Sequence, residues 1–96
     1  MKRRPLELRE EAWLEWQDAS LHYDLEKQGL GCRFDEAVVA ALEHLTSVTA
    51  RYQARENGFR YAPVAKFLYC IVFELDGDTV VVYNIHHTSR RLLGGK

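Results

Sequence analysis

Apolar residues in the first half of the chain recur with the 3.6-residue period of an α-helix, in two separate stretches. Gly29 and Gly31 lie between the two stretches. The segment 29–31 is so short that it can form only a tight turn, which makes the two helices antiparallel. The sequence therefore predicts a helical hairpin. The stripe residues are Ala12, Trp16, Ala19 and Tyr23 in the first helix and Phe34, Val38, Ala41, Leu42 and Leu45 in the second.

After Gly58 the apolar period changes to two. The runs Phe67–Leu75 and Thr79–Ile85 are rich in aromatic and β-branched residues, as strands are. Between them, Asp76 and Gly77 form the dipeptide that two-residue hairpin turns prefer. These features predict an antiparallel β-hairpin.

Two further strands are expected, a short one at Leu6–Leu8 and another at Phe59–Val64 that Pro63 places at a sheet edge or ends. The element order is then β-α-α-β-β-β. We expect one α+β domain over residues 1–96, with the short N-terminal strand and helical hairpin packed on one face of a small antiparallel sheet.

Both faces of the expected β-hairpin are apolar. Helices can cover only one face of a small sheet, so other chain or another protein must cover the second. One face is expected to hold Phe67, Tyr69, Ile71 and Phe73, the other Leu68, Cys70 and Val72, and on the partner strand Val81, Tyr83 and Ile85 alternate with Val80 and Val82.

The composition is that of an ordinary globular protein, with 47% hydrophobic and 28% charged residues among 96. No apolar run suits a membrane span or signal peptide, so we expect a cytoplasmic protein without a membrane partner. The net charge is −1, divided into −4 over residues 1–48 and +3 over residues 49–96. The basic half favours an acidic partner or a phosphate backbone.

Metal and cofactor chemistry has no support in the pattern. Cys32 and Cys70 are expected to be reduced, packed thiols. No paired Cys/His spacing of a zinc site and no glycine-rich phosphate loop is present, and no serine or cysteine lies in a nucleophile motif. We therefore expect neither metal nor cofactor. The histidines are His22, His44, His86 and His87.

Adjacent His86 and His87 must point to opposite faces of a strand. One of them could act as a general base or contact phosphate, since imidazole titrates near neutral pH. The alternative is that one ring packs at the rim of the core and the other is solvated.

Four cations could form a basic patch if their strand ends lie on the same side of the sheet. The patch would hold a phosphate or acidic side chains of a partner. The alternative is that they are solvated surface charges. They are Arg60, Lys66, Arg90 and Arg91.

Trp13 and Trp16 on the first helix are either core residues or partner anchors at the rim. Tyr83, in the last strand, joins the candidates for partner binding.

The order of the expected strands and helices, and the spacing of the motifs on them, resemble those of the ParE/RelE superfamily of bacterial toxins from Leu6 to Arg91. Residues 12–34 resemble the ParE-type helical hairpin. Residues 67–78 are similar to the family's Phe-Pro-Tyr strand and Asp-Gly turn, although Leu68 stands where proline is usual. The stretch from His87 to Arg90 is similar to the family's His-x-x-Arg ending, and Arg60 lies where an arginine commonly opens the second strand.

The resemblance implies the toxin of a type II toxin–antitoxin pair, neutralised by a cognate antitoxin that wraps it. The ParE branch implies inhibition of DNA gyrase by binding, as in plasmid stabilisation. The RelE branch implies ribosome-dependent mRNA cleavage, for which Lys66, His87 and Arg90 are the candidates.

The chain departs from the RelE pattern because it is slightly acidic and has no tyrosine after Tyr83. The sequence thus favours a binding-type inhibitor over an enzyme, and a toxin-fold relic without activity is a third reading. Without antitoxin, we expect self-association, as a homodimer, through the uncovered sheet face.

Overall fold

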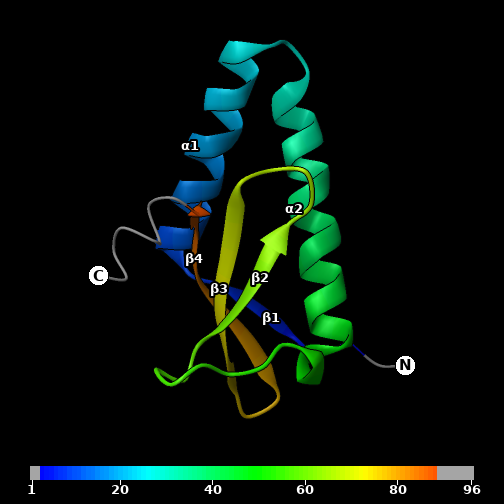
Figure 1. Cartoon of the computed structure of the whole chain (residues 1–96), viewed down its shortest axis with the longest axis vertical. Helices are drawn as coiled ribbons and strands as arrows, with labels where there is room; N and C mark the ends of the chain where they lie inside the picture. Colours follow the sequence, from blue (N-terminus) through cyan, green and yellow to red (C-terminus); the bar gives the residue numbers. More distant parts are fainter. Residues whose placement is uncertain (1–2, 89–96) are drawn as a thin grey trace.

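The computed structural model describes residues 3–88 and has the predicted order of elements (Figure 1). A four-stranded sheet with the order β1-β4-β3-β2 packs against two helices that extend beyond its end. The α+β class is confirmed. The elements are β1 (Leu6–Leu8), α1 (Glu10–Glu26), α2 (Leu30–Ser47), the 3-10 turn η1 (Thr49–Arg51), β2 (Arg60–Val64), β3 (Tyr69–Asp76) and β4 (Thr79–His87).

The sheet is mixed rather than purely antiparallel. β1 pairs in parallel with β4, with Leu6 opposite Val80 and Leu8 opposite Val82. A parallel pair needs a long connection, and here everything from α1 to β3 supplies it. The predicted hairpin of β3 and β4 is confirmed, with Asp76 opposite Thr79.

The turn of the helical hairpin lies slightly earlier than predicted. Gly29 adopts a left-handed φ of 89° after α1 ends, but Gly31 lies in the first turn of α2. The Asp24 carboxylate accepts the N–H groups of Gly29 at 3.0 Å and Gly31 at 3.1 Å, which ties the two helices together at the tip of the hairpin.

A β-bulge changes the predicted faces of β4. Phe73 lies opposite Val82 and Val72 opposite Asn84, so Tyr83 is an extra residue in the ladder. The prediction that Tyr83 and Ile85 share a face is therefore wrong, because the inserted residue breaks the period of two. Ile85 instead joins Val82 on the helix-facing side and is fully buried.

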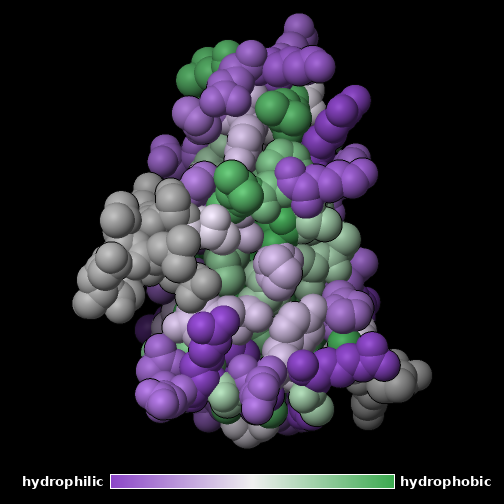
Figure 2. All heavy atoms as spheres, in the orientation of Figure 1, coloured by the Kyte–Doolittle hydropathy of each residue, from purple (hydrophilic) through white to green (hydrophobic). Residues whose placement is uncertain are grey.

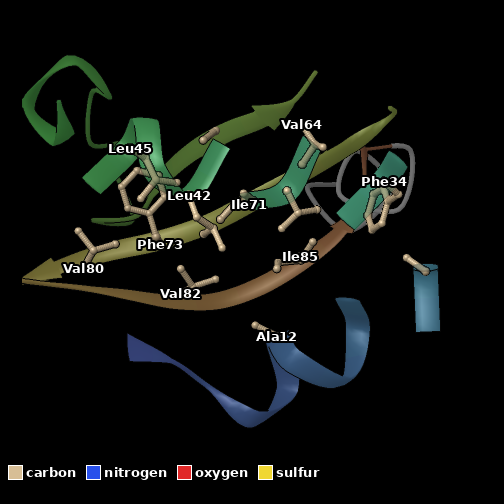
Figure 3. Packing of buried hydrophobic residues seen from close by; sticks show 13 residues of the cluster. Ala12, Phe34, Leu42, Leu45, Val64, Ile71, Phe73, Val80, Val82 and Ile85 are labelled. Atoms are coloured by element: carbon tan, nitrogen blue, oxygen red, sulfur yellow. The ribbon is translucent and has the colours of Figure 1, made fainter. Parts of the chain in front are cut away.

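The core lies between that face of the sheet and the helical hairpin (Figure 3). α2 contributes its large residues, whereas α1 contributes only two alanines that are more than nine-tenths buried. The buried cluster consists of Ala12, Ala19, Phe34, Val38, Leu42, Leu45, Ala62, Val64, Ile71, Phe73, Val80, Val82 and Ile85.

The second face of the sheet is not the open apolar surface that the sequence led us to expect. Its small residues Cys70, Val72 and Val81 are only 5%, 6% and 4% exposed. Larger side chains lie around them, with the ring of Phe59 5.4 Å from that of Tyr83. Among residues 3–88, this face therefore shows no large apolar patch of the kind on which the expected self-association rests.

Candidate partner-binding site

A groove runs along the outer side of the helical hairpin, between α1 and α2. The tip of the hairpin stands beyond the strands, so no strand covers the helices there (Figure 1). The hollow has a volume of about 760 Å³. We call it the interhelical groove, and its lining residues are Trp13, Trp16, Gln17, Ser20, Leu21, Asp24, Gly29, Gly31, Cys32 and Asp35.

The two tryptophans of α1 differ in their surroundings. Trp16 packs against the core, and its indole Nε1–H donates a hydrogen bond to Asp35 Oδ1 at 2.9 Å. Trp13 meets Trp16 edge to face, with ring centroids 5.8 Å apart, and remains 45% exposed. Packing therefore describes Trp16. Trp13 is exposed, as the alternative of a partner anchor requires, and that role stays a prediction.

Cys32 also opens into the interhelical groove. It is exposed, whereas Cys70 is buried in the sheet, and neither forms a disulfide. The prediction of a packed thiol is correct for Cys70 and wrong for Cys32, which lies on the side of α2 that faces the groove.

Three leucines of α1 are exposed because they lie off the stripe that faces the core. Leu14, Leu21 and Leu25 are 55%, 59% and 79% exposed and follow one another at i, i+7 and i+11. Sequence reasoning did not identify this second stripe, although its helical spacing could have shown it. Figure 2 shows a different region, where hydrophobic residues reach the surface in the middle of the molecule, over β2 and β3, with hydrophilic residues bordering them.

The helical hairpin is strongly acidic. Its net charge is more negative than the −4 of the N-terminal half as a whole. Residues 10–47 carry nine Asp/Glu and two Lys/Arg, a net charge of −7. Some of these carboxylates border the interhelical groove. A surface with this charge attracts cations rather than phosphate.

Arg60 lies apart from Lys66, the other candidate cation among residues 3–88. Its guanidinium donates hydrogen bonds to the backbone carbonyl oxygens of Tyr52, at 2.7 Å, and Thr49, at 3.4 Å. It lies at the start of β2, whereas Lys66 follows the end of that strand, about 13 Å or more away along the chain direction. Arg60 and Lys66 therefore do not lie together, and Arg60 holds the segment after α2 onto the sheet.

The two histidines point to opposite faces of β4, as predicted. His87 lies opposite Tyr69 on the core side, and the two ring centroids are 5.4 Å apart. His86 lies opposite Cys70, with its Nδ1 3.2 Å from the carbonyl oxygen of His87.

Tyr83 lies on the second face at the bulge. The Arg9 guanidinium lies over its ring, 5.4 Å from the centroid, and Phe59 meets it edge to face. A hydrogen bond with the Glu74 carboxylate, with a smaller effect of burial, raises the pKa of the phenol above its ordinary value of 10.0. The phenol therefore stays neutral at physiological pH.

No family model and no curated protein sequence matches the chain. Among solved structures, a chain of the chromosomal ParDE TA system from P. aeruginosa matches with a TM-score of 0.78 over 88% of this chain and 96% of that one. The chain has the ParE/RelE toxin fold. Its sequence is 15% identical to that ParDE chain, so the likeness lies in the architecture of strand, helical hairpin and sheet.

Within this ParE/RelE fold, two of the three residues considered for RNA cleavage lie at the same end of the sheet. Tyr69 pairs with Val64, just before the turn that holds Lys66, and also with His87. Lys66 is exposed and adopts a positive φ of 71°. Arg90 and Arg91 lie outside the described residues.

Residues 3–88 of this toxin fold hold no group of three or more His, Cys, Asp or Glu that could bind a metal ion. In the same range, neither helix is long and apolar enough to cross a membrane.

Proposed function

We propose that this chain is the toxin of a type II toxin–antitoxin pair in the cytoplasm, kept inactive by a cognate antitoxin. We further propose that the free toxin acts by binding a protein target, for which DNA gyrase is the candidate, and not by cleaving mRNA. The observation that carries the proposal is the match of nearly the whole chain to a chain of a ParDE system.

The surface supports a binding function. The interhelical groove combines the exposed indole of Trp13 with the exposed side chain of Leu21, and aromatic anchors beside apolar residues are typical of protein interfaces. Histidine and lysine at the end of the sheet are the features that favour the alternative, a RelE-like ribonuclease. Against it stand the net charge of −1 and the separation of Arg60 from Lys66, because RNA binding rests on clustered cations.

The decisive experiment is to induce this chain alone in a bacterial host and to measure DNA synthesis and translation separately. Arrest of DNA synthesis while translation continues is the expected result. Co-expression with the product of the neighbouring gene should restore growth, because the antitoxin binds the toxin before its target does.

Two other outcomes would overturn the proposal in different ways. An immediate stop of translation, with cuts in message on ribosomes, would assign the chain to the RelE-like alternative. Normal growth with abundant folded protein would indicate a toxin-fold relic. Purified gyrase should also be inhibited directly, and a supercoiling assay checks that step without a living host.

A further inference from the structure

The segment before β1 passes the end of α2 and forms a hollow with the turn η1 (Figure 1). Two backbone hydrogen bonds hold this segment in place. The N–H of Arg4 donates to the Thr46 carbonyl oxygen at 3.1 Å, and the N–H of Val80 donates to the Pro5 carbonyl oxygen at 2.9 Å. The hollow has a volume of about 580 Å³, which is in the range of small-molecule sites. We call it the arginine hollow, and its charged lining residues are Arg3, Arg4, Arg51 and Asp78.

The arginine hollow is positively charged although the chain as a whole is not. Three guanidinium groups against one carboxylate leave a net charge of +2 at its lining. Arg51 lies in η1, far along the chain from Arg3 and Arg4, so only the tertiary structure brings the three together. None of them is among the four cations that the sequence singled out.

Two of these guanidinium groups have carboxylate partners that leave them able to bind a further anion. Arg4 Nη1 lies 2.7 Å from Asp78 Oδ1, a contact that uses one of its nitrogens and fixes the side chain. Arg3 Nη1 lies 3.8 Å from Glu43 Oε2, and both side chains are more than half exposed, so this pair is weak. Within residues 3–88, Arg51 is exposed and forms no ion pair. A strong anion can therefore engage Arg3 and Arg51 while Asp78 holds Arg4 in place.

The arginines lie at the end of α2, where cations also complement the helix dipole. Hydrogen bonding to the end of the helix does not occupy their side chains, however. The Thr46 carbonyl oxygen accepts the backbone N–H of Arg4, and the Leu45 carbonyl oxygen accepts the Thr49 hydroxyl at 2.6 Å. The carbonyl oxygen of Thr49 accepts the Arg60 guanidinium. The last carbonyl groups thus have other donors, and the three guanidinium groups of the hollow remain available to a ligand.

We propose that the arginine hollow binds an oligophosphate group, a di- or triphosphate that is free or part of a nucleotide. Each guanidinium offers a planar pair of N–H donors that matches two phosphate oxygens. A diphosphate carries more negative charge than the carboxylate of Glu43, so it can displace that weak partner from Arg3. The site goes beyond the proposed function and does not depend on toxicity.

The arrangement of the charges suits a compact anion better than a nucleic-acid strand. The three arginines line a single hollow, whereas a strand needs cations that follow its backbone. Glu43 and Asp78 lie beside the arginines and would repel the neighbouring phosphates of an extended polyanion.

The test is titration of the purified full chain with tripolyphosphate, ATP and sulfate at equal ionic strength, followed by calorimetry and NMR. We expect tripolyphosphate to bind more tightly than sulfate, with chemical-shift changes centred on residues 3–4 and 47–51. Tighter binding of ATP than of tripolyphosphate identifies a nucleotide as the source of the phosphates, and equal binding identifies a free oligophosphate; either result agrees with the proposal. Sulfate that binds as tightly as tripolyphosphate, shifts centred elsewhere, or a DNA duplex that binds more tightly through the same residues would overturn it.

Matched variants separate the arginine hollow from general attraction. Arg51→Gln and Arg3→Gln should each weaken tripolyphosphate binding roughly tenfold, as loss of a charge-assisted hydrogen bond does. The control Arg33→Gln removes the same charge from an exposed position near the start of α2 and should change the affinity by no more than about twofold, because salt screens distant charges. Glu43→Gln should strengthen binding about two- to fivefold, since Arg3 loses its competing partner. Equal weakening by Arg33→Gln and Arg51→Gln would mean that net charge alone attracts the anion, and would contradict the proposal.

Thermal unfolding gives a second measurement of the same site. A ligand that binds only the folded chain raises the melting temperature. Tripolyphosphate should raise it for the unmutated chain and for Arg33→Gln, and much less for Arg51→Gln. The same rise in Arg51→Gln as in the unmutated chain would exclude the arginine hollow as the site. Growth arrest is measured independently, so the failure of this inference leaves the toxin assignment unchanged.

Discussion

Glu15 Oε1 accepts the backbone N–H of Ile85 at 2.8 Å, which joins the middle of α1 to β4 just beyond the bulge. The same oxygen accepts the side-chain amide of Asn84 at 3.2 Å. β1 pairs with β4 only as far as Val82, so the carboxylate supplies an acceptor on that edge of β4 where no strand does. A helix residue thereby satisfies part of a sheet ladder.

Replacing Glu15 by alanine should therefore destabilise the fold by about 1–3 kcal/mol, because the part-buried Ile85 N–H loses its acceptor. Urea denaturation of Glu15→Ala measures this loss. Glu11→Ala, which removes an exposed carboxylate one turn earlier, serves as the control and should change stability little. Equal stability of the two variants would contradict this role of Glu15.

Close approach of the two helices predicts a second stability effect, at Gly31. A Cβ there would stand 2.5 Å from the backbone oxygen of Ser20, so Gly31→Ala must push the helices apart. Overpacking of this kind costs about 1–3 kcal/mol and should lower the melting temperature. At Gly29 a Cβ meets nothing within 4 Å, and Gly29→Ala carries only the strain of its positive φ. If Gly31→Ala is as stable as the unmutated chain, the helices are not held this close.

Arg60 is expected to support the fold rather than partner binding. Arg60→Ala removes hydrogen bonds to the Tyr52 and Thr49 carbonyl oxygens and should cost about 1–3 kcal/mol. Arg51→Ala removes an exposed arginine of the same segment and is the control. Denaturation curves of both variants measure the effect on stability. Growth assays at a temperature where both variants are folded measure the effect on partner binding. A stable Arg60→Ala that has lost partner binding would restore the interpretation as a contact residue.

Stability should fall as the pH rises above about 10, through the tyrosines of the core rim. The pKa values of Tyr23 and Tyr52 are both raised above their ordinary value of 10.0. Burial is the main cause for Tyr23 and the cause for Tyr52. Because the folded pKa exceeds the unfolded one, this contribution is complete below pH 10 and is lost as the phenols ionise in the folded state. Denaturation of Tyr52→Phe between pH 9 and 11.5, roughly the range of tyrosine ionisation, should show a shallower decline than that of the unmutated chain. A decline of the same steepness would exclude Tyr52 as a source.

The residues considered for RNA cleavage should be dispensable for growth arrest. Lys66→Ala, His87→Ala and Arg90→Ala should each arrest DNA synthesis as the unmutated chain does, and no ribosome-dependent cuts should appear in message from any of them. Trp13→Ala gives a useful comparison, because it alters the proposed interaction surface instead. Codon-spaced cuts by the unmutated chain that disappear in His87→Ala would establish catalysis.

Local signals in the sequence correctly predicted the helical hairpin and the Asp76–Gly77 turn, and the resemblance seen in the sequence correctly predicted the fold. They also placed Ile71 and Phe73 together on the core face of β3, because side-chain period and turn chemistry act between near neighbours. The separation of His86 and His87 follows from the same period.

The features of the fold and of the candidate site that the sequence did not predict depend on contacts between distant parts of the chain. Tyr83 became a bulge, so the alternating pattern failed after Val82, and β1 paired in parallel with β4 because of the path of the intervening chain. The hydrogen bonds of Arg60 to carbonyl oxygens hold it at the start of β2, at the opposite end of that strand from Lys66. The interhelical groove formed because the only fully buried residues of α1 are alanines and the hairpin tip extends past the sheet, which leaves apolar and acidic side chains without a covering layer. Such relations depend on which surfaces meet in three dimensions, and local periodicity carries no information about them.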